Sequence, residues 1–175
     1  VTAVGGTAGS KESAASLSSG GFSYRWPVPA WQKDAVKSFL SGSGLPDAKL
    51  FSKAGRGFPD VSAQAVNYMV ISFGVPSPVA GTSCASPTFA GVLSLVNDAR
   101  LRAGKPTLGF VNPLLYKNPT ALNDVTSGCN PGCDTKGFCA VPGWDPVTGL
   151  GTPNFAKLAN LTGSAGRAAA APIVV

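Results

Sequence analysis

The segment that most limits the possible folds of this chain is its longest helical pattern, residues 83 to 103. Ser83 is placed to cap the helix, and residues 85 to 96 are apolar on nearly every side of it. Pro87 falls in the expected first turn, where backbone amides have no partner within the helix and proline is tolerated. The pattern therefore predicts a buried helix rather than a surface one.

Shorter patterns on both sides of this helix predict further elements within a single domain of 175 residues. Strands are expected at residues 1–7 and 67–73, the second ended by Gly and Pro residues. Helices are expected within residues 29–42, 110–116 and 154–161. Residues 55–65 show no regular pattern, and residues 121–155 are expected to form a long loop rich in Gly, Pro and Cys.

The composition excludes several classes of protein. Hydrophobic residues make up 44% of the chain and charged residues 13%, which is typical of a folded, secreted, loop-rich protein rather than a disordered one. The net charge of +6 comes from basic residues dispersed along the chain, whereas nucleic-acid binders gather them on one surface. No apolar stretch approaches the roughly 18 residues of a membrane span, and no signal-peptide pattern follows Val1. We therefore expect neither a nucleic-acid nor a membrane partner.

The four cysteines are unevenly distributed. Cys84 stands alone, whereas Cys129, Cys133 and Cys139 share one loop. Because the chain has no histidine, these three thiols supply too few ligands for a closed zinc site. A disulfide within the loop, with one sulfur left over, is the better interpretation and implies an oxidising compartment. The glycosylation triplet at residues 160–162 agrees with secretion.

The string Gly-Thr-Ser-Cys-Ala-Ser-Pro at residues 81–87 suggests a nucleophile at Ser83. A hydroxyl at a helix N-terminus lies in the positive field of unpaired amides, which favours the negative charge that develops during acyl transfer. The small residues Gly81, Ala85 and Ser86 would let a substrate backbone approach. The alternative is that Ser83 only caps the helix.

A serine nucleophile needs a base, and histidine is absent. Lys53 and Lys105 are the nearest lysines in sequence, but nothing marks either of them as buried. A carboxylate can also act as the base, and its ordinary pKa of about 4 suits it to acidic conditions.

The chain resembles the sedolisins, the serine-carboxyl peptidases that keep the subtilisin fold and replace histidine with glutamate. The resemblance extends from VTAVGGT through GGFS, AWQ, GRGFPDVSA and GTSCASPTFAGVLSLVNDAR to LGFVNPLLY, NDVTSGC and PGWDPVTGLGTPNF, and is closest to the tripeptidyl-peptidase branch. It implies an α/β fold with a subtilisin-like parallel sheet flanked by helices. Residues 1–162 would form the C-terminal portion of the peptidase domain, and residues 163–175 an Ala-rich tail.

The resemblance also implies a mechanism, with Ser83 as the attacking serine of an acid-acting peptidase. In the family a Glu and an Asp four residues apart on one helix complete the triad, and a further Asp contributes to the oxyanion hole. Glu12 is the only glutamate here and has Ser16 four residues later, and neither Asp34 nor Asp47 lies in the required motif. Asp60 is interpreted as structural. The acidic groups are therefore expected on an upstream segment, and the chain alone is expected to be inactive.

A second hypothesis from another class remains open: a non-catalytic secreted fragment that acts as a binding or defence protein. Its sequence support is the missing acid pair. For the whole peptidase, we expect a secreted protein or one in an acidic compartment like a lysosome or vacuole, with peptides or proteins as substrates.

The resemblance further implies a disulfide pairing and a metal site. Cys129 would pair with Cys139, while Cys133 would bind a cysteine in the N-terminal part of the same precursor. One structural Ca²⁺ is expected in the long loop at residues 121–155. Its expected ligands are the side chains of Asp124 and Asp145 and the backbone oxygens of Val125, Val141 and Gly143.

Overall fold

The computed structural model describes residues 1–163, so the tail expected at residues 163–175 lies outside the described residues except for Gly163. The centre of the fold is a parallel pair of strands, β1 (Val4–Ala8) and β5 (Val61–Gln64), with Val4 opposite Val61. A two-residue strand, β2 (Ser13–Ala14), pairs antiparallel with the end of β1. The strand expected at residues 1–7 is thus present, displaced toward Ala8.

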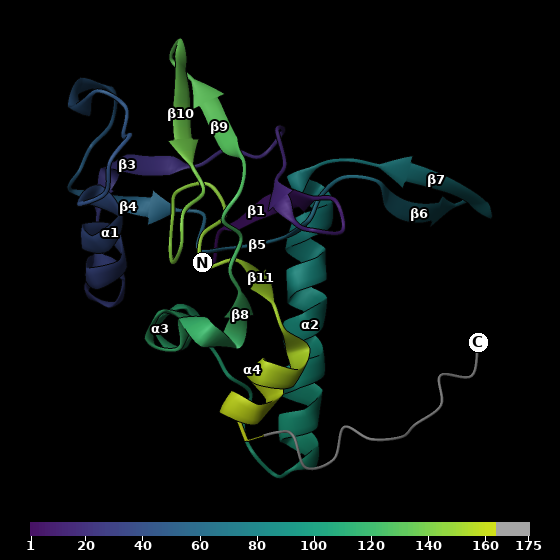
Figure 1. The fold of residues 1–175 in the computed structure, drawn as a ribbon. Coiled ribbons are helices and arrows are strands. Elements are labelled where there is room, and N and C mark those ends of the chain that lie inside the picture. The colour runs from purple at the N-terminus through teal and green to yellow at the C-terminus, as the bar shows by residue number, and fades with distance from the viewer. Residues whose placement is uncertain (164–175) are drawn as a thin grey trace.

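Helix α2 (Thr82–Arg102) packs against this central pair, as Figure 1 shows. Ala85 is fully buried beside a cluster of small residues, and Phe89 and Val96 continue the buried side. The opposite side, which includes Ala90, Gly91 and Leu95, is exposed in this structure. The expectation of a helix buried all round is therefore not met within the described residues: α2 covers the sheet with one face.

The helix start also differs from the prediction. Gly81 occupies the N-cap position, and Ser83 lies within the first turn. Pro87 consequently lies inside the helix beyond the first turn, so the expectation that placed it there is wrong. Its missing N–H is the one that would bond to the carbonyl of Ser83 in a regular α-helix.

A second group of elements lies at the left of Figure 1, away from α2. Strand β3 (Gly21–Pro27) pairs with β4 (Gly55–Phe58). Between these two strands in sequence lie the helices η1 (Ala30–Gln32), α1 (Lys33–Leu40) and η2 (Ala48–Leu50). Aromatic rings from these elements and the C-terminal loops form one cluster, which consists of Phe22, Phe39, Phe51, Phe138 and Trp144. The helix predicted within residues 29–42 is confirmed.

Residues 55–65, for which no regular structure was expected, contain the strands β4 and β5. The Gly and Pro residues of this segment give no strand pattern in the sequence. The strands form because each of them pairs with a strand that is distant in sequence, β4 with β3 and β5 with β1. Asp60 N–H, just before β5, for example donates to the carbonyl of Ala3, just before β1, at 2.8 Å.

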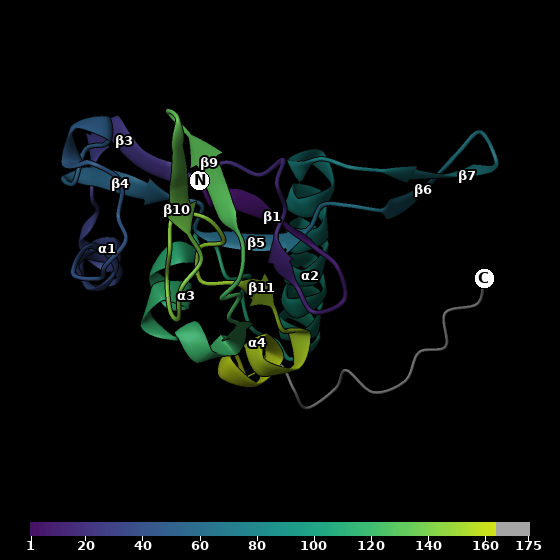
Figure 2. The same ribbon diagram turned by 45° about the horizontal axis from the view of Figure 1, so that its top comes forward.

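The predicted strand at residues 67–73 is present as β6 (Tyr68–Ser72), and it forms a hairpin with β7 (Val75–Val79). Figures 1 and 2 both show this hairpin projecting away from the rest of the molecule. The prolines expected to end the strand lie inside β7, opposite Met69 and Ile71. These pairs alternate with the hydrogen-bonded pairs of the ladder, so the two prolines remove no bond between the strands.

The C-terminal third contains short elements arranged around a disulfide. They are α3 (Asn112–Lys117), η3 (Pro119–Ala121), β8 (Leu122–Asn123), β9 (Cys129–Gly132), β10 (Thr135–Cys139), β11 (Thr152–Pro153) and α4 (Phe155–Leu161). The helices expected at residues 110–116 and 154–161 are confirmed. The expected long loop is instead interrupted by four short strands. Within the described residues, no helix is both long and apolar enough to cross a bilayer.

Candidate active site

Ser83 lies in the first turn of α2, and its side chain is exposed. Its two successors, Cys84 and Ala85, point into the protein and are buried. Within residues 1–163 the hydroxyl of Ser83 forms no hydrogen bond, so it does not cap the helix. The capping interpretation is therefore wrong, and the hydroxyl is accessible beside amides of the first turn that have no helical partner.

The backbone before Ser83 is fixed against the sheet. Gly81 N–H donates to the Ala65 carbonyl at 2.8 Å, and Cys84 N–H donates to the Gly81 carbonyl at 2.9 Å. Gly81 has φ 155°, a value that residues with a side chain rarely adopt. A Cβ at this position would lie 3.8 Å from Ser83 Oγ. Glycine thus keeps the space beside the hydroxyl open.

No carboxyl group of the described residues hydrogen-bonds to Ser83, although all eight acidic residues of the chain lie among them. Glu12, the only glutamate, accepts a hydrogen bond from Thr152 Oγ1 at 2.8 Å. Asp98 forms an ion pair with Arg102 near the far end of α2. That the base lies on another segment of the protein stays a prediction.

The two lysines considered as alternative bases are also unsuited. Lys105 follows the C-terminal end of α2, which at about 1.5 Å per residue places it roughly 30 Å along the helix from Ser83. Its Nζ donates to the Gly163 carbonyl at 2.8 Å. Lys53 is exposed in the turn before β4, so it is not enclosed as the lysine of a serine–lysine pair would need to be.

Asp60, interpreted as structural, is fully buried at the centre of a polar network. Its carboxylate accepts from Ala3 N–H at 2.7 Å and from the Tyr116 hydroxyl at 3.0 Å, and it forms an ion pair with Arg56 at 2.5 Å. Gln32 also donates to the Tyr116 oxygen at 2.7 Å. Burial, and next the charge of Asp60, raises the pKa of Tyr116 strongly, so the hydroxyl stays protonated and continues to donate. The network joins β1 to α3 and η1.

Asp145 is the most enclosed of the predicted metal ligands. Its Oδ1 accepts from Val147 N–H at 3.0 Å and Thr148 N–H at 2.8 Å, and its Oδ2 accepts from Val141 N–H at 3.0 Å. Burial raises the pKa of Asp145 to about 6, and these hydrogen bonds oppose that shift. A carboxylate that is so enclosed and yet ionised at neutral pH would be stabilised by a nearby cation.

The other four predicted ligands lie around the same loop. Asp124 Oδ2 accepts from Gly143 N–H at 2.8 Å, so the loop at residues 141–143 bonds to both carboxylates. The Val125 carbonyl accepts from Thr148 Oγ1 at 3.1 Å. Within residues 1–163 the carbonyls of Val141 and Gly143 accept no hydrogen bond. Two carboxylates and three carbonyls in one loop fit the oxygen-rich coordination of calcium.

No cluster of three or more His, Cys, Asp or Glu residues occurs in the part of the chain that the structure describes. A cation site here would therefore depend on backbone oxygen. Thr148, which the sequence pattern did not single out, is fully buried and contacts Asp145 through both its N–H and its hydroxyl. The spacing Asp-Pro-Val-Thr, an Asp followed by donors two and three residues later, was the available signal.

The internal disulfide is the pair that the family resemblance implied. Cys129 and Cys139 form a disulfide across the β9–β10 hairpin. Cys84 is a buried free thiol that packs as a small apolar residue. Cys133 is exposed at the hairpin turn with a free thiol. Its pairing with an upstream cysteine remains a prediction.

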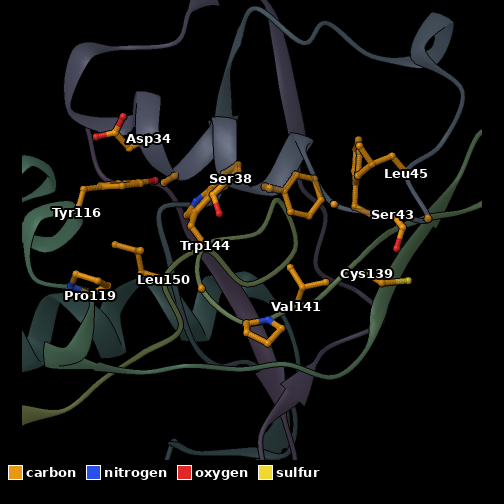
Figure 3. A pocket seen from close by; sticks show the side chains of 17 residues that line it. Asp34, Ser38, Ser43, Leu45, Tyr116, Pro119, Cys139, Val141, Trp144 and Leu150 are labelled. Carbon is orange, nitrogen blue, oxygen red and sulfur yellow. The ribbon is translucent and has the colours of Figure 1, made fainter.

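A cavity with a volume of about 580 Å³ is lined by residues that do not include Ser83. Figure 3 shows Ser38 of α1 and Tyr116 on one side of it and Val141 on the other, around Trp144. It borders the candidate calcium loop through Val141 and Gly143. None of its lining residues belongs to α2 or the β6–β7 hairpin, so it is separate from the candidate nucleophile.

No model of a known protein family matches the chain. Individual proteins do match. Tripeptidyl-peptidase 1 from Homo sapiens is 48% identical over 172 residues, which is 90% of this chain and 31% of that protein. Aorsin from Aspergillus oryzae is 44% identical over 156 residues, which is 82% of this chain and 24% of that protein. The chain thus spans 24% to 31% of the length of these curated relatives.

A solved structure agrees with these matches. Pseudomonas sedolisin, described as a serine-carboxyl proteinase and solved with two molecules of pseudo-iodotyrostatin, superposes with a TM-score of 0.71 and 29% identity. The match covers 95% of this chain and 47% of that one. The parallel β1–β5 pair and helix α2 therefore belong to a known mixed α/β architecture.

Proposed function

The chain belongs to the sedolisin family of serine-carboxyl peptidases, and on this premise we propose that Ser83 is the nucleophile of an acid-acting peptidase. The observation that supports the role of Ser83 is its exposed hydroxyl in the first turn of a helix whose next two residues are buried. The hydroxyl oxygen would attack the scissile carbonyl and form an acyl-enzyme. The unpaired amides of the first turn would favour the negative charge that develops on the carbonyl oxygen.

The proton of Ser83 would pass to a carboxylate and then to the leaving amine, after which water would release the acyl group. We propose that this carboxylate, its acidic partner and the oxyanion Asp belong to a part of the protein outside this chain. The eight carboxyl residues of the chain provide no hydrogen-bonded partner for Ser83 in the described structure. We expect the chain alone to be inactive and either unstable or held by a second polypeptide.

The proposed substrates are peptides and proteins, and the similarity to tripeptidyl-peptidase 1 favours release of tripeptides from free N-termini. A carboxylate base with an ordinary pKa of about 4 would make the protein active in acid. The disulfide supports a secreted protein or one in an acidic, oxidising compartment.

The test compares the intact protein with Ser83→Ala on a fluorogenic tripeptide amide at about pH 4. Loss of a nucleophile lowers turnover by several orders of magnitude, so we expect at least a thousandfold decrease. Ser94→Ala is the matched control, because Ser94 is an exposed serine about three turns further along α2 and its change should leave the rate within about twofold. Equal turnover of wild type and Ser83→Ala would remove Ser83 from the mechanism.

We also propose one structural Ca²⁺ held by the side chains of Asp124 and Asp145 and the carbonyls of Val125, Val141 and Gly143. The arrangement of these groups around one loop supports the site. When bound, the ion would neutralise the two carboxylates and hold the loop. Asp124→Asn should lower the calcium content and the unfolding temperature together, whereas Asp134→Asn, an exposed aspartate at the hairpin turn, should change neither.

For Cys133 we propose a disulfide with a cysteine in the N-terminal part of the same precursor. Its exposure at the tip of the β9–β10 hairpin supports this proposal. The intact mass of the native protein, measured with and without reductant, tests it. A second polypeptide released only by reductant, and absent from Cys133→Ser, is the expected result if the precursor has been cleaved. In an uncleaved protein, peptide mapping should find Cys133 in a disulfide.

A further inference from the structure

Asn160 is an exposed residue of α4, two positions before the residue that ends the helix, Thr162. It begins the triplet Asn160-Leu161-Thr162, the pattern at which secreted proteins receive N-linked oligosaccharides. Such a triplet also arises by chance. Two structural observations distinguish this one from a chance match.

The first observation is that the fold gives the Asn160 side chain no structural role. The chain has eight asparagines, and all of them lie within residues 1–163. Asn67 has φ 54°, a conformation that Asn adopts more readily than most residues. Among the described residues only Asn160 has neither a side-chain hydrogen bond nor a positive φ, although Asn is a poor helix former. The other six bond through their side chains; they are Asn97, Asn112, Asn118, Asn123, Asn130 and Asn154.

The second observation is the direction in which this part of α4 packs. Leu158 and Ala159 are buried, whereas Asn160 is exposed and Leu161 is 37% exposed. Thr162 is buried again, and its hydroxyl donates to the Leu158 carbonyl at 2.8 Å. An oligosaccharide on Asn160 would therefore leave the packed side of the helix undisturbed.

The buried hydroxyl of Thr162 is accessible before the domain folds. Helix α4 has 7 residues, fewer than the roughly 12 that an isolated helix needs in water, so it depends on packing against the rest of the domain. Arg100 of α2 contributes to this packing, since its Nη1 donates to the Thr162 carbonyl at 2.7 Å. A newly made chain thus presents the whole triplet in an unfolded form.

A second triplet of similar sequence provides an internal comparison. Asn118-Pro119-Thr120 has Asn and Thr at the same spacing, but its central proline excludes it from the glycosylation pattern. Asn118 also has a structural role, because its Nδ2 donates to the Leu114 carbonyl at 2.9 Å. Modification is therefore expected at only one of the two triplets.

We propose that Asn160 carries an N-linked oligosaccharide. The proposal rests on the secreted localisation proposed above. Nδ2 of Asn160 would form a bond to C1 of the first sugar of a lipid-linked donor and lose one proton, and the lipid diphosphate would leave from C1. Arg100, which contacts Thr162, lies roughly 25 Å along α2 from Ser83 at about 1.5 Å per residue, so the oligosaccharide is attached far from the candidate nucleophile.

Peptide mapping of the native protein tests this proposal. Trypsin releases residues 158–167, which contain Asn160, and residues 118–136, which contain Asn118. We expect an endoglycosidase that removes N-linked sugars to lower the mass of the protein and to leave Asp at position 160, while position 118 stays Asn. Asn160→Gln should abolish the modification, whereas Thr162→Ser, which keeps both the triplet and a buried hydroxyl, should retain it.

An unmodified Asn160 in protein with an intact Cys129–Cys139 disulfide would overturn the proposal, because the chain would have passed through an oxidising compartment without receiving a sugar. Unmodified protein with reduced cysteines would overturn the secreted localisation as well. N-linked sugar that persists in Asn160→Gln would place the modification elsewhere and also overturn the proposal. Asn160→Gln should cleave the tripeptide amide within about twofold of the wild-type rate, so the role of Ser83 is tested independently of the sugar.

Discussion

The carboxylate of Asp60 accepts a hydrogen bond from the hydroxyl of Tyr116 at 3.0 Å, across a sequence distance of 56 residues. This contact joins the segment between β4 and β5 to helix α3, and Ala3 and Arg56 bond to the same carboxylate. A fully buried acid with these partners determines how the N-terminal strand meets the rest of the domain.

Tyr116→Phe should destabilise the intact protein by about 1–3 kcal/mol, because it removes a donor to a buried carboxylate and an acceptor for Gln32. Urea unfolding measures the change. Tyr24→Phe is the matched control, since the Tyr24 hydroxyl bonds to the Leu50 carbonyl at an exposed site. Its change should stay within about 0.5 kcal/mol. Equal effects of the two substitutions would contradict a special role for the buried network.

Gly57→Ala should also destabilise the protein, for a steric reason. A Cβ at this position would overlap the ring of Trp144, which is buried and donates to the Pro59 carbonyl at 3.0 Å. Overpacking of this kind costs about 1–3 kcal/mol. Gly132→Ala is the control, because a Cβ there meets nothing within 4 Å. A shift of the Trp144 fluorescence in Gly57→Ala but not in Gly132→Ala would accompany the loss of stability.

Asp145 gives the calcium-free protein a defined pH dependence. Burial raises its pKa from 3.8 to about 6 in the folded state, so the folded chain binds the proton more tightly than the unfolded chain. The corresponding stability is fully present below about pH 4 and is lost as the pH rises through about 6. A shift of this size amounts to about 3 kcal/mol at most.

The measurement is the unfolding temperature in chelator at pH 4.5 and pH 7 for wild type and Asp145→Asn. Wild type should lose more stability than the variant over this range. Added calcium should reduce that difference, because the ion stabilises the ionised form of Asp145. The same pH dependence in Asp145→Asn would show that other groups produce it.

The Cys129–Cys139 disulfide should stabilise the protein by about 2–3 kcal/mol, because it closes a loop with a sequence separation of 10 residues in the unfolded chain. The double substitution Cys129→Ser with Cys139→Ser should lower the unfolding midpoint accordingly. Cys84→Ala, at a buried free thiol, is the control and should cost less. No difference between the two changes would mean that the hairpin holds its conformation without the bond.

Several elements of the candidate site were predictable because they depend on short stretches of sequence. The apolar run after residue 83 determines α2, and Asn154 caps α4 at the place where its pattern begins. The three clustered cysteines led to one internal disulfide, and the resemblance to the family selected the pair at residues 129 and 139. The position of Ser83 beside the helix start was predicted to within one turn.

Other features could not be derived from local patterns. The strands β4 and β5 lie in a segment with Gly and Pro residues and exist because β3 and β1 pair with them. The prolines of β7 are compatible with a strand only because they fall at positions that do not bond to β6. Ser83 exposes its hydroxyl instead of capping α2, because Gly81, bonded to Ala65, occupies the N-cap position.

The sequence by itself determined which segments are helical, where the candidate nucleophile lies and which residue types could hold a cation. Those properties depend on side chains a few positions apart, so neighbouring residues suffice to specify them. The tertiary structure alone decided that Asp60 meets Tyr116, that one loop bonds to both Asp124 and Asp145, and that the β6–β7 hairpin projects from the start of α2. Contacts between distant residues form only where the whole chain buries enough surface to offset the entropy of bringing them together.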